Sequence, residues 1–110
     1  MRLTRPAEFR QVFAQGRRFA TRHFTLLVRP NGLDHPRLGL AISRKVARRA
    51  VDRNRLKRLI REGFRHHQVA LDGIDVVAMA RRGSAEAPNS EIAQGLERVW
   101  LKIAKSCHAS

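Results

Sequence analysis

Arginine and lysine side chains share residues 48–65, RRAVDRNRLKRLIREGFR, with apolar side chains at helical spacing. At about 3.6 residues per turn, the two kinds of side chain fall on opposite sides of an α-helix. The apolar side comprises Leu56, Leu59, Ile60, Gly63 and Phe64. The basic side comprises Asn54, Arg58, Arg61 and Arg65. Such a helix can pack on a core through one side and bind a polyanion such as a phosphate backbone through the other.

The whole chain is strongly basic. It has 110 residues, with 23 Lys and Arg against 9 Asp and Glu, which gives a formal net charge of +14. This balance favours nucleic acid as the partner, ahead of an anionic membrane surface or an acidic protein. Arginine outnumbers lysine, which favours bidentate recognition of phosphates or bases. The 43% of hydrophobic residues, in periodic patterns, exclude a disordered tail.

One compact domain is expected over residues 1–110, with residues 106–110 frayed. No apolar run approaches the length of a membrane span, and the first residues lack the pattern of a signal peptide. We therefore expect a cytoplasmic protein without a membrane partner. The single cysteine, Cys107, excludes an internal disulfide bond and a structural zinc site.

The elements around the basic helix are predicted from capping residues, from glycine and proline positions, and from the periodicity of apolar residues. A first helix is expected from a cap at Thr4 or Arg5 to a stop at Gly16. Strands are expected within 19–29, at 38–43 and at 74–80, and a last helix begins at Asn89 or Ser90 after a loop at 84–89. The sequence therefore predicts a single α+β domain in layers, in which a helix, strands, a second helix, a strand and a last helix follow one another. The strand at 38–43, the basic helix and the strand at 74–80 form a crossover unit.

Residues 38–43 alternate between large and small side chains. Leu38, Leu40 and Ile42 lie on one face of the expected strand, and the opposite face carries Gly39, Ala41 and Ser43. A face of small residues lets another molecule or element approach the backbone closely. Two interpretations stay open: part of the floor of a binding cleft, or a surface beneath a packed helix.

Residues 51–64, VDRNRLKRLIREGF, carry a resemblance to a known family. They follow Ser43-Arg44-Lys45 and precede the strand DVVAMAR, and this arrangement resembles the bacterial ribonuclease P protein subunit. The segments AEFRQVFAQGRRF and RHFTLLV look like the first helix and first strands of that family. The resemblance implies a small accessory protein that binds a large catalytic RNA, ribonuclease P RNA. The complex removes the 5′ leader of precursor transfer RNA by hydrolysis.

In that family the RNA carries the chemistry. The resemblance therefore implies an accessory subunit of an endoribonuclease that does not cleave by itself and needs no obligate protein partner. It also implies a single-domain α-β sandwich of order αβββαβα, with a left-handed crossover around the basic helix that is an exception to the usual right-handed rule.

The resemblance assigns two sets of residues. The set that meets the catalytic RNA comprises Arg53, Asn54, Arg55, Lys57, Arg58 and Arg61, with Lys45 and Arg65 as extensions. The alternative for this set is a merely solvated basic helix face. The set that lines a cleft for the single-stranded leader comprises Phe9, Phe13, Arg17, Arg18, Arg22 and Arg29. Core packing is the alternative for the two phenylalanines, and it carries more weight for Phe13 than for Phe9.

The acidic residues and histidines show no pattern of a protein-held metal centre. The nine acidic residues contain no paired-carboxylate motif, and the adjacent His66 and His67 cannot both face one ion in the usual i, i+4 way. We therefore expect Mg²⁺ to be held mainly by the RNA, and no protein-bound cofactor. His23 and His35 are expected at the surface, and Trp100 in the core of the last helix.

Two other function classes fit the charge and size. A ribosomal or other structural RNA-binding protein would bind ribosomal RNA without affecting leader removal. A DNA-binding module would place the basic helix in a major groove and would bind a duplex DNA site more tightly than structured RNA at matched salt.

Overall fold

The computed structural model describes residues 6–108, and for Glu8, Cys107 and His108 the backbone alone. The elements in chain order are α1 (Pro6–Gln15), β1 (Arg17–Ala20), β2 (Phe24–Pro30), β3 (Arg37–Ala41), α2 (Ala50–His66), β4 (Ile74–Ala80), the short 3₁₀ helix η1 (Ser84–Glu86) and α3 (Asn89–His108). This order confirms αβββαβα, with η1 inside the expected loop. The expected cap at Thr4 or Arg5 lies outside the described residues. None of the helices within residues 6–108 is long and apolar enough to cross a membrane.

The four strands form one mixed sheet in the order β1-β2-β4-β3. β2 pairs antiparallel with β1 and with β4, whereas β3 pairs parallel with β4. Parallel strands cannot be joined by a tight turn, and α2 supplies the crossover between them. The crossover unit is therefore confirmed, and β3 forms one edge of the sheet.

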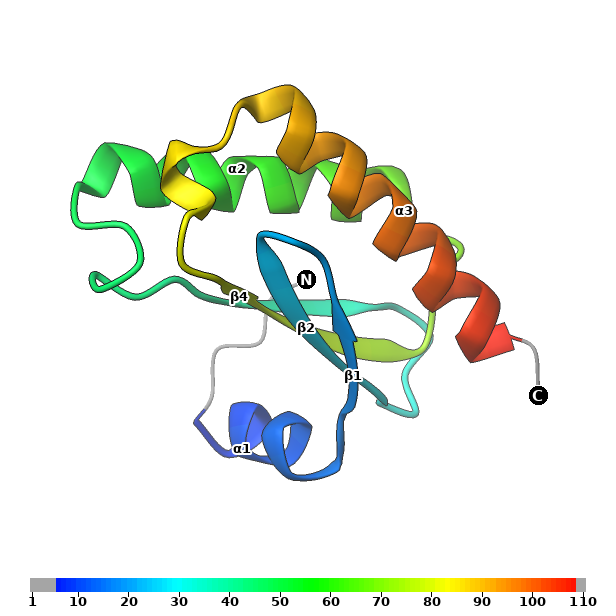
Figure 1. The fold of residues 1–110 in the computed structure, drawn as a ribbon. Helices are drawn as coiled ribbons and strands as arrows, with labels where there is room; N and C mark the ends of the chain where they lie inside the picture. Colours follow the sequence, from blue (N-terminus) through cyan, green and yellow to red (C-terminus); the bar gives the residue numbers. More distant parts are fainter. Residues whose placement is uncertain (1–5, 109–110) are drawn as a thin grey trace.

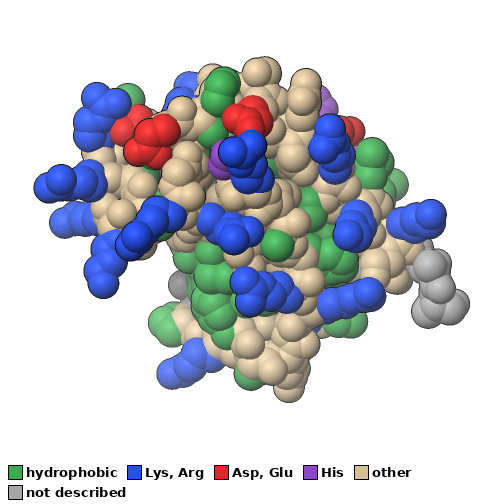
Figure 2. Space-filling view, viewed as in Figure 1, with side chains coloured by type: hydrophobic (Ala, Val, Ile, Leu, Met, Phe, Trp, Pro, Cys, Tyr) green, Lys and Arg blue, Asp and Glu red, His purple; other side chains and the backbone are tan. Residues whose placement is uncertain are grey.

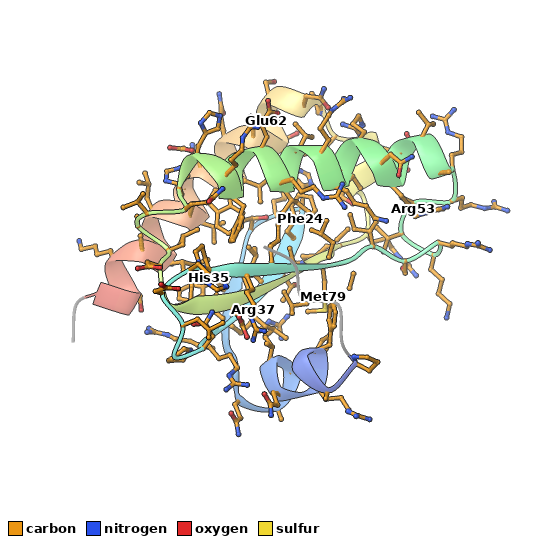
Figure 3. All side chains as sticks on the ribbon, turned by 180° about the vertical axis from the view of Figure 1, so that it is seen from behind. Phe24, His35, Arg37, Arg53, Glu62 and Met79 are labelled. Atoms are coloured by element: carbon orange, nitrogen blue, oxygen red, sulfur yellow. The ribbon has the colours of Figure 1, made fainter. Side chains whose placement is uncertain are left out.

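Helices cover both faces of the sheet. α2 and α3 lie together on one face, and α1 lies on the other (Figure 1). The main core lies under α2 and α3, where Leu26 and Val76 of the sheet meet Leu56 and Ile60 of α2. A smaller cluster lies under α1, where Phe9, Val12, Leu27, Val77 and Met79 pack together. Met79 points from the sheet toward α1 (Figure 3).

Trp100 fixes the packing of α3 against α2. Its side chain is fully buried, which confirms the expected core position, and its ring meets Phe64 edge-on with 5.9 Å between centroids. Gly63 permits this approach, because a Cβ atom there would lie 2.5 Å from Nε1 of Trp100. The glycine on the apolar side of α2 therefore sets how closely the two helices approach.

A buried ion pair joins the ends of three strands. Asp75 of β4 is 1% exposed and accepts two hydrogen bonds from Arg37 of β3, at 2.8 Å and 2.7 Å. Asn31, just after β2, donates a third bond to the same carboxylate at 2.9 Å. Buried charges are tolerated when they are paired and hydrogen-bonded in this way.

Candidate nucleic-acid interface

The two sides of α2 are separated as the sequence predicts. Leu56, Ile60 and Phe64 are buried in the main core. The side chains on the opposite side, Asn54, Arg58, Arg61 and Arg65, are all exposed. Glu62 also points away from the sheet (Figure 3). We call these four exposed residues the basic ridge. They can meet a phosphate backbone without any change in the packing of the helix.

Arg53 points toward the loop that precedes α2 rather than along the basic ridge. Its Nη1 donates hydrogen bonds to the carbonyl oxygens of Ala47 and Arg48, both at 2.9 Å. In Figure 3, Arg53 lies between the start of α2 and this loop. The guanidinium therefore fixes the shape of the segment that carries Lys45, which is exposed. Arg53 therefore orders this loop and does not extend the basic ridge.

The first turn of α2 contains a second bond that orders the loop. Arg49 donates from Nε to Oδ2 of Asp52 at 2.9 Å. This hydrogen bond is the main reason that the pKa of Asp52 is lowered below its ordinary value of 3.8. Ionised Asp52 also lies near the positive end of the helix dipole, which favours the negative charge.

Arg55 joins α2 to the start of α3. It donates to the carbonyl oxygen of Ala85 at 2.8 Å and to that of Ala87 at 3.3 Å, and it also donates to Oδ1 of Asn89. Ala85 lies in η1, Ala87 follows it, and Asn89 is the first residue of α3. Arg53 and Arg55 thus bind carbonyl groups of the protein, while Asn54 between them is exposed.

Cations gather at the end of the molecule where the loop before α2 lies. Figure 2 shows a group of Lys and Arg side chains there. A hollow of about 600 Å³ separates this loop from the segment after β4. Its lining includes Lys45, Arg48, Arg49 and Arg82. The assignment from sequence did not include Arg82, because its place after β4 gives no sign that it faces this loop.

The expected leader cleft is assembled only in part, on the face of the sheet that carries α1. Phe13 is 50% exposed, whereas Phe9 packs against the smaller cluster. The core interpretation is therefore wrong for Phe13, and packing accounts better for Phe9. Arg29 donates from Nη1 to Oε1 of Gln11 in α1 at 2.7 Å. Arg18 pairs with Leu27, which lies under α1, and is on the same face. We call Phe13, Arg18 and Arg29 with the neighbouring sheet the α1 face.

Arg17 and Arg22 lie on the other side of the sheet, beside α3. Arg17 donates to Oγ of Ser106 and lies over the ring of Phe19, 5.3 Å from its centroid. Arg22 donates to Oε1 of Glu91 at 3.3 Å. The structure therefore does not bring these two arginines together with the other four residues of the expected cleft.

His23 corrects the expectation that it lies at the surface. It is 9% exposed, and its Nε2 lies 3.6 Å from Oε1 of Glu91 in α3. This separation is too long for a hydrogen bond. Within the turn between β1 and β2, the Thr21 hydroxyl accepts hydrogen bonds from the backbone N–H groups of His23 and Phe24. Among the residues described, no group of three His, Cys, Asp or Glu side chains is placed to hold a metal ion.

The small residues of β3 lie on the side of the sheet that carries α1. Gly39 pairs with Val77 and Ala41 with Met79, and both partners belong to the smaller cluster. α1 packs mainly on β2 and β4, so the small face of β3 lies beside this helix. Gly39 is buried, Ala41 is half-buried and Ser43 is exposed, so both interpretations of this face stay open.

Comparisons of sequence and of structure both relate this chain to ribonuclease P proteins. The model of the ribonuclease P protein family matches residues 1–104. The ribonuclease P protein component of Nitrosococcus oceani is 48% identical over 110 residues, which are 100% of this chain and 92% of that protein. That of Thioalkalivibrio sulfidiphilus is 50% identical over 107 residues, or 97% of this chain and 89% of that protein.

Two solved structures share the fold. The ribonuclease P protein of Staphylococcus aureus superposes with a TM-score of 0.85 at 36% identity and covers 94% of each chain. That of Thermotoga maritima gives a TM-score of 0.81 at 30% identity and covers 94% of this chain and 97% of the other. The family model covers nearly the whole chain, and both solved structures share its fold, including the crossover around the basic helix. The chain therefore belongs to the ribonuclease P protein family.

Proposed function

We propose that this chain is the protein subunit of ribonuclease P and assists the endonucleolytic removal of the 5′ leader from precursor transfer RNA in the cytoplasm. The basic ridge of α2 binds the catalytic RNA, and the α1 face binds the leader. The observation that supports this proposal most strongly is the ridge itself. Its four side chains are exposed, while the core residues Leu56, Ile60 and Phe64 hold the helix rigidly beneath them.

The physical basis of RNA binding is charge neutralisation. Each phosphate that an arginine neutralises releases condensed counterions, which makes the affinity high at low salt and lower as salt increases. Arg58, Arg61 and Arg65 supply exposed guanidinium groups that can make bidentate contacts with phosphates. Exposed Asn54 adds an amide that can bond a base edge or a 2′-hydroxyl group.

The α1 face suits a single strand. The exposed ring of Phe13 offers a stacking platform for a base, and Arg18 and Arg29 lie on the same face to attract the backbone. Stacking tolerates any base, because every base has an aromatic face. A leader of variable sequence can therefore be held in one place.

In this proposal the RNA subunit carries out the hydrolysis, and the chain acts by binding. The Mg²⁺ that assists the reaction is held mainly by the RNA. The support is the donor set of the chain: its nine acidic residues include no paired-carboxylate motif that would hold two metal ions.

The test is a cleavage assay with precursor transfer RNA, in which the chain, ribonuclease P RNA and the mixture of the two are compared across a Mg²⁺ series. The proposal predicts no cleavage by the chain alone. It predicts that the chain lowers the Mg²⁺ concentration that the RNA requires and strengthens substrate binding. Robust cleavage by the RNA-free chain would contradict the assignment of chemistry to the RNA.

A structural RNA-binding protein remains the alternative and predicts a different result. Such a protein would bind ribosomal RNA and leave the rate of leader removal by ribonuclease P RNA unchanged. Binding to both RNAs at matched salt, together with the cleavage assay, separates the two functions.

A further inference from the structure

A recess of about 310 Å³ lies between the edge strand β3 and α2, below the basic ridge. Its apolar lining comes from two elements. Leu38 and Leu40 alternate with small residues on β3 and therefore point to the face that α2 covers. Phe64 of α2 closes the inner end and is 5% exposed. The recess thus has a hydrophobic floor that is open at the edge of the sheet.

The rim of the recess is polar and basic. Lys57, Arg61, Arg65 and Gln68 line it, and their spacing of four, four and three residues places them along one stripe of the helical segment. Among the residues that the structure describes, none that lines the recess is acidic. An anion that enters would therefore meet cations without a competing carboxylate in the lining.

The position at the sheet edge adds hydrogen-bonding groups. β3 is the last strand in the order β1-β2-β4-β3, and an edge strand presents a row of backbone N–H and C=O groups to whatever approaches it. Together with the amide of Gln68, these groups match the donors and acceptors along the edge of a nucleobase.

We propose that the recess is a subsite for one unstacked nucleotide of the RNA that α2 binds, with the base on the floor of leucines and its phosphate at Arg61 or Arg65. This inference rests on the proposed function of the basic ridge and deepens it. Sequence-specific recognition of RNA commonly uses bases that leave the helical stack. With such a subsite, the chain recognises the local shape of the RNA as well as its charge.

The alternative occupant of an apolar recess with a basic rim is a fatty acid. RNA is favoured because Arg61 and Arg65 belong to both the rim and the basic ridge. They also line a neighbouring hollow with Arg58 and Glu62 on the outer side of α2. A backbone held along the ridge would therefore pass the mouth of the recess, whereas a free fatty acid gains nothing from the ridge.

The first test is an NMR titration of the ¹⁵N-labelled chain with adenosine 5′-monophosphate, inorganic phosphate and decanoate in separate samples. The proposal predicts that adenosine monophosphate shifts the amide signals of Leu38, Leu40 and Gln68, and that phosphate shifts signals of the ridge alone. Shifts from adenosine monophosphate that are confined to those seen with phosphate would overturn the proposal. If decanoate shifts the amide signals of the recess residues and adenosine monophosphate does not, the recess is assigned to a fatty acid instead.

The second test measures the affinity for ribonuclease P RNA with variants that change the recess. Leu40→Phe fills it, and Leu40→Met, which nearly conserves volume, is the control for the packing of β3. Gln68→Glu adds a negative charge at the rim. Val69→Glu adds the same charge one residue away, at a side chain that is 92% exposed and does not line the recess. Circular dichroism and thermal unfolding establish that each variant is folded.

The expected result is that Leu40→Phe and Gln68→Glu each weaken RNA binding about tenfold relative to their controls, as the loss of one base contact predicts. Equal affinities of each variant and its control would overturn the subsite. Arg58→Ala separates this outcome from a failure of the proposed function. If Arg58→Ala weakens binding while the recess variants do not, the ridge stands and the subsite fails. If Arg58→Ala also has no effect, the proposed function of the ridge fails.

Discussion

Replacement of Arg55 by alanine is predicted to destabilise the fold, although Arg55 lies in the basic motif that resembles an RNA-binding site. The substitution removes the hydrogen bonds to the carbonyl oxygens of Ala85 and Ala87 and to the side chain of Asn89. These bonds are the link between α2 and the segment that enters α3. Residue 55 itself is half-buried, so water reaches the vacated carbonyl groups only in part.

The magnitude follows from the bonds that are lost. Hydrogen bonds from a charged group contribute about 1.5–3 kcal/mol each, and the 3.3 Å bond to Ala87 is weak. Removal of a positive charge from a chain of net charge +14 offsets part of the loss, because it reduces self-repulsion. We therefore expect the free energy of unfolding to fall by roughly 2–3 kcal/mol. For a domain of this size, this lowers Tm by roughly 8–12 °C.

The assay is urea and thermal unfolding of Arg55→Ala beside two matched variants. Arg55→Lys keeps the charge, but a lysine cannot reach three acceptors with a planar fork, so it is also expected to be less stable than the parent chain. Arg58→Ala removes an exposed cation of the ridge and is expected to unfold within about 0.5 kcal/mol of the parent chain. Unchanged stability of Arg55→Ala, with a loss of RNA affinity equal to that of Arg58→Ala, would refute the structural role.

Three further predictions concern the core, the α1 face and the start of α2. Gly63→Ala should lower the free energy of unfolding by about 1–3 kcal/mol in urea, because the new Cβ atom would overlap the buried tryptophan ring. Gly95→Ala is the control, since its Cβ atom would meet its nearest neighbour at 3.8 Å, and equal effects would refute the packing argument. Phe13→Ala should reduce the preference for leader-bearing over mature transfer RNA by about tenfold in binding assays, with little change in Tm, and equal loss for both ligands would count against stacking. Asp52→Asn should weaken the fold slightly at neutral pH and should have no such effect once the pH lies below the lowered pKa of Asp52 in the folded state. The reason is that the lowered pKa stabilises the folded state fully above the ordinary pKa of 3.8, and this contribution is lost as pH falls through the folded-state value. The measurement is unfolding across a pH series, and a difference that persists at the acid end would contradict the linkage.

The fold of the chain was largely predictable because its signals are local. The apolar and basic sides of α2 follow from helical periodicity alone, and the buried strand at Ile74–Ala80 reads as an apolar run. A helix of this kind between two apolar strands implies a crossover, and the parallel pairing of β3 with β4 confirms it.

The roles of the arginines were less predictable, because their partners are distant in the chain. The carbonyl acceptors of Arg55 lie 30 and 32 residues farther along. Position on a helix flank gives no sign of such partners. Arg17 and Arg18 are a different case: they are neighbours on β1, and the alternation of side chains along a strand places them on opposite faces. The sequence therefore contained the information that separates Arg17 from the α1 face.

The two phenylalanines of α1 show a third kind of limit. Phe9 and Phe13 share one stripe of the helix, so periodicity cannot say which ring is covered. The angle at which α1 lies on β2 and β4 decides this, and it buries part of Phe9 while leaving Phe13 half-exposed. The docking angle depends on the packing of Val12 against Val77, which no local pattern specifies.

Directed hydroxyl-radical cleavage tests the central claim most directly. Iron–EDTA is tethered to a cysteine introduced by Glu62→Cys, next to the basic ridge, in a chain that also carries Cys107→Ser, and the complex with ribonuclease P RNA is then probed. The control site is Leu101→Cys on α3, where the side chain is 55% exposed. The account predicts strong, localised cleavage of the RNA from position 62 and little from position 101. Cleavage from position 101 without cleavage from position 62 would contradict the claim that α2 faces the RNA.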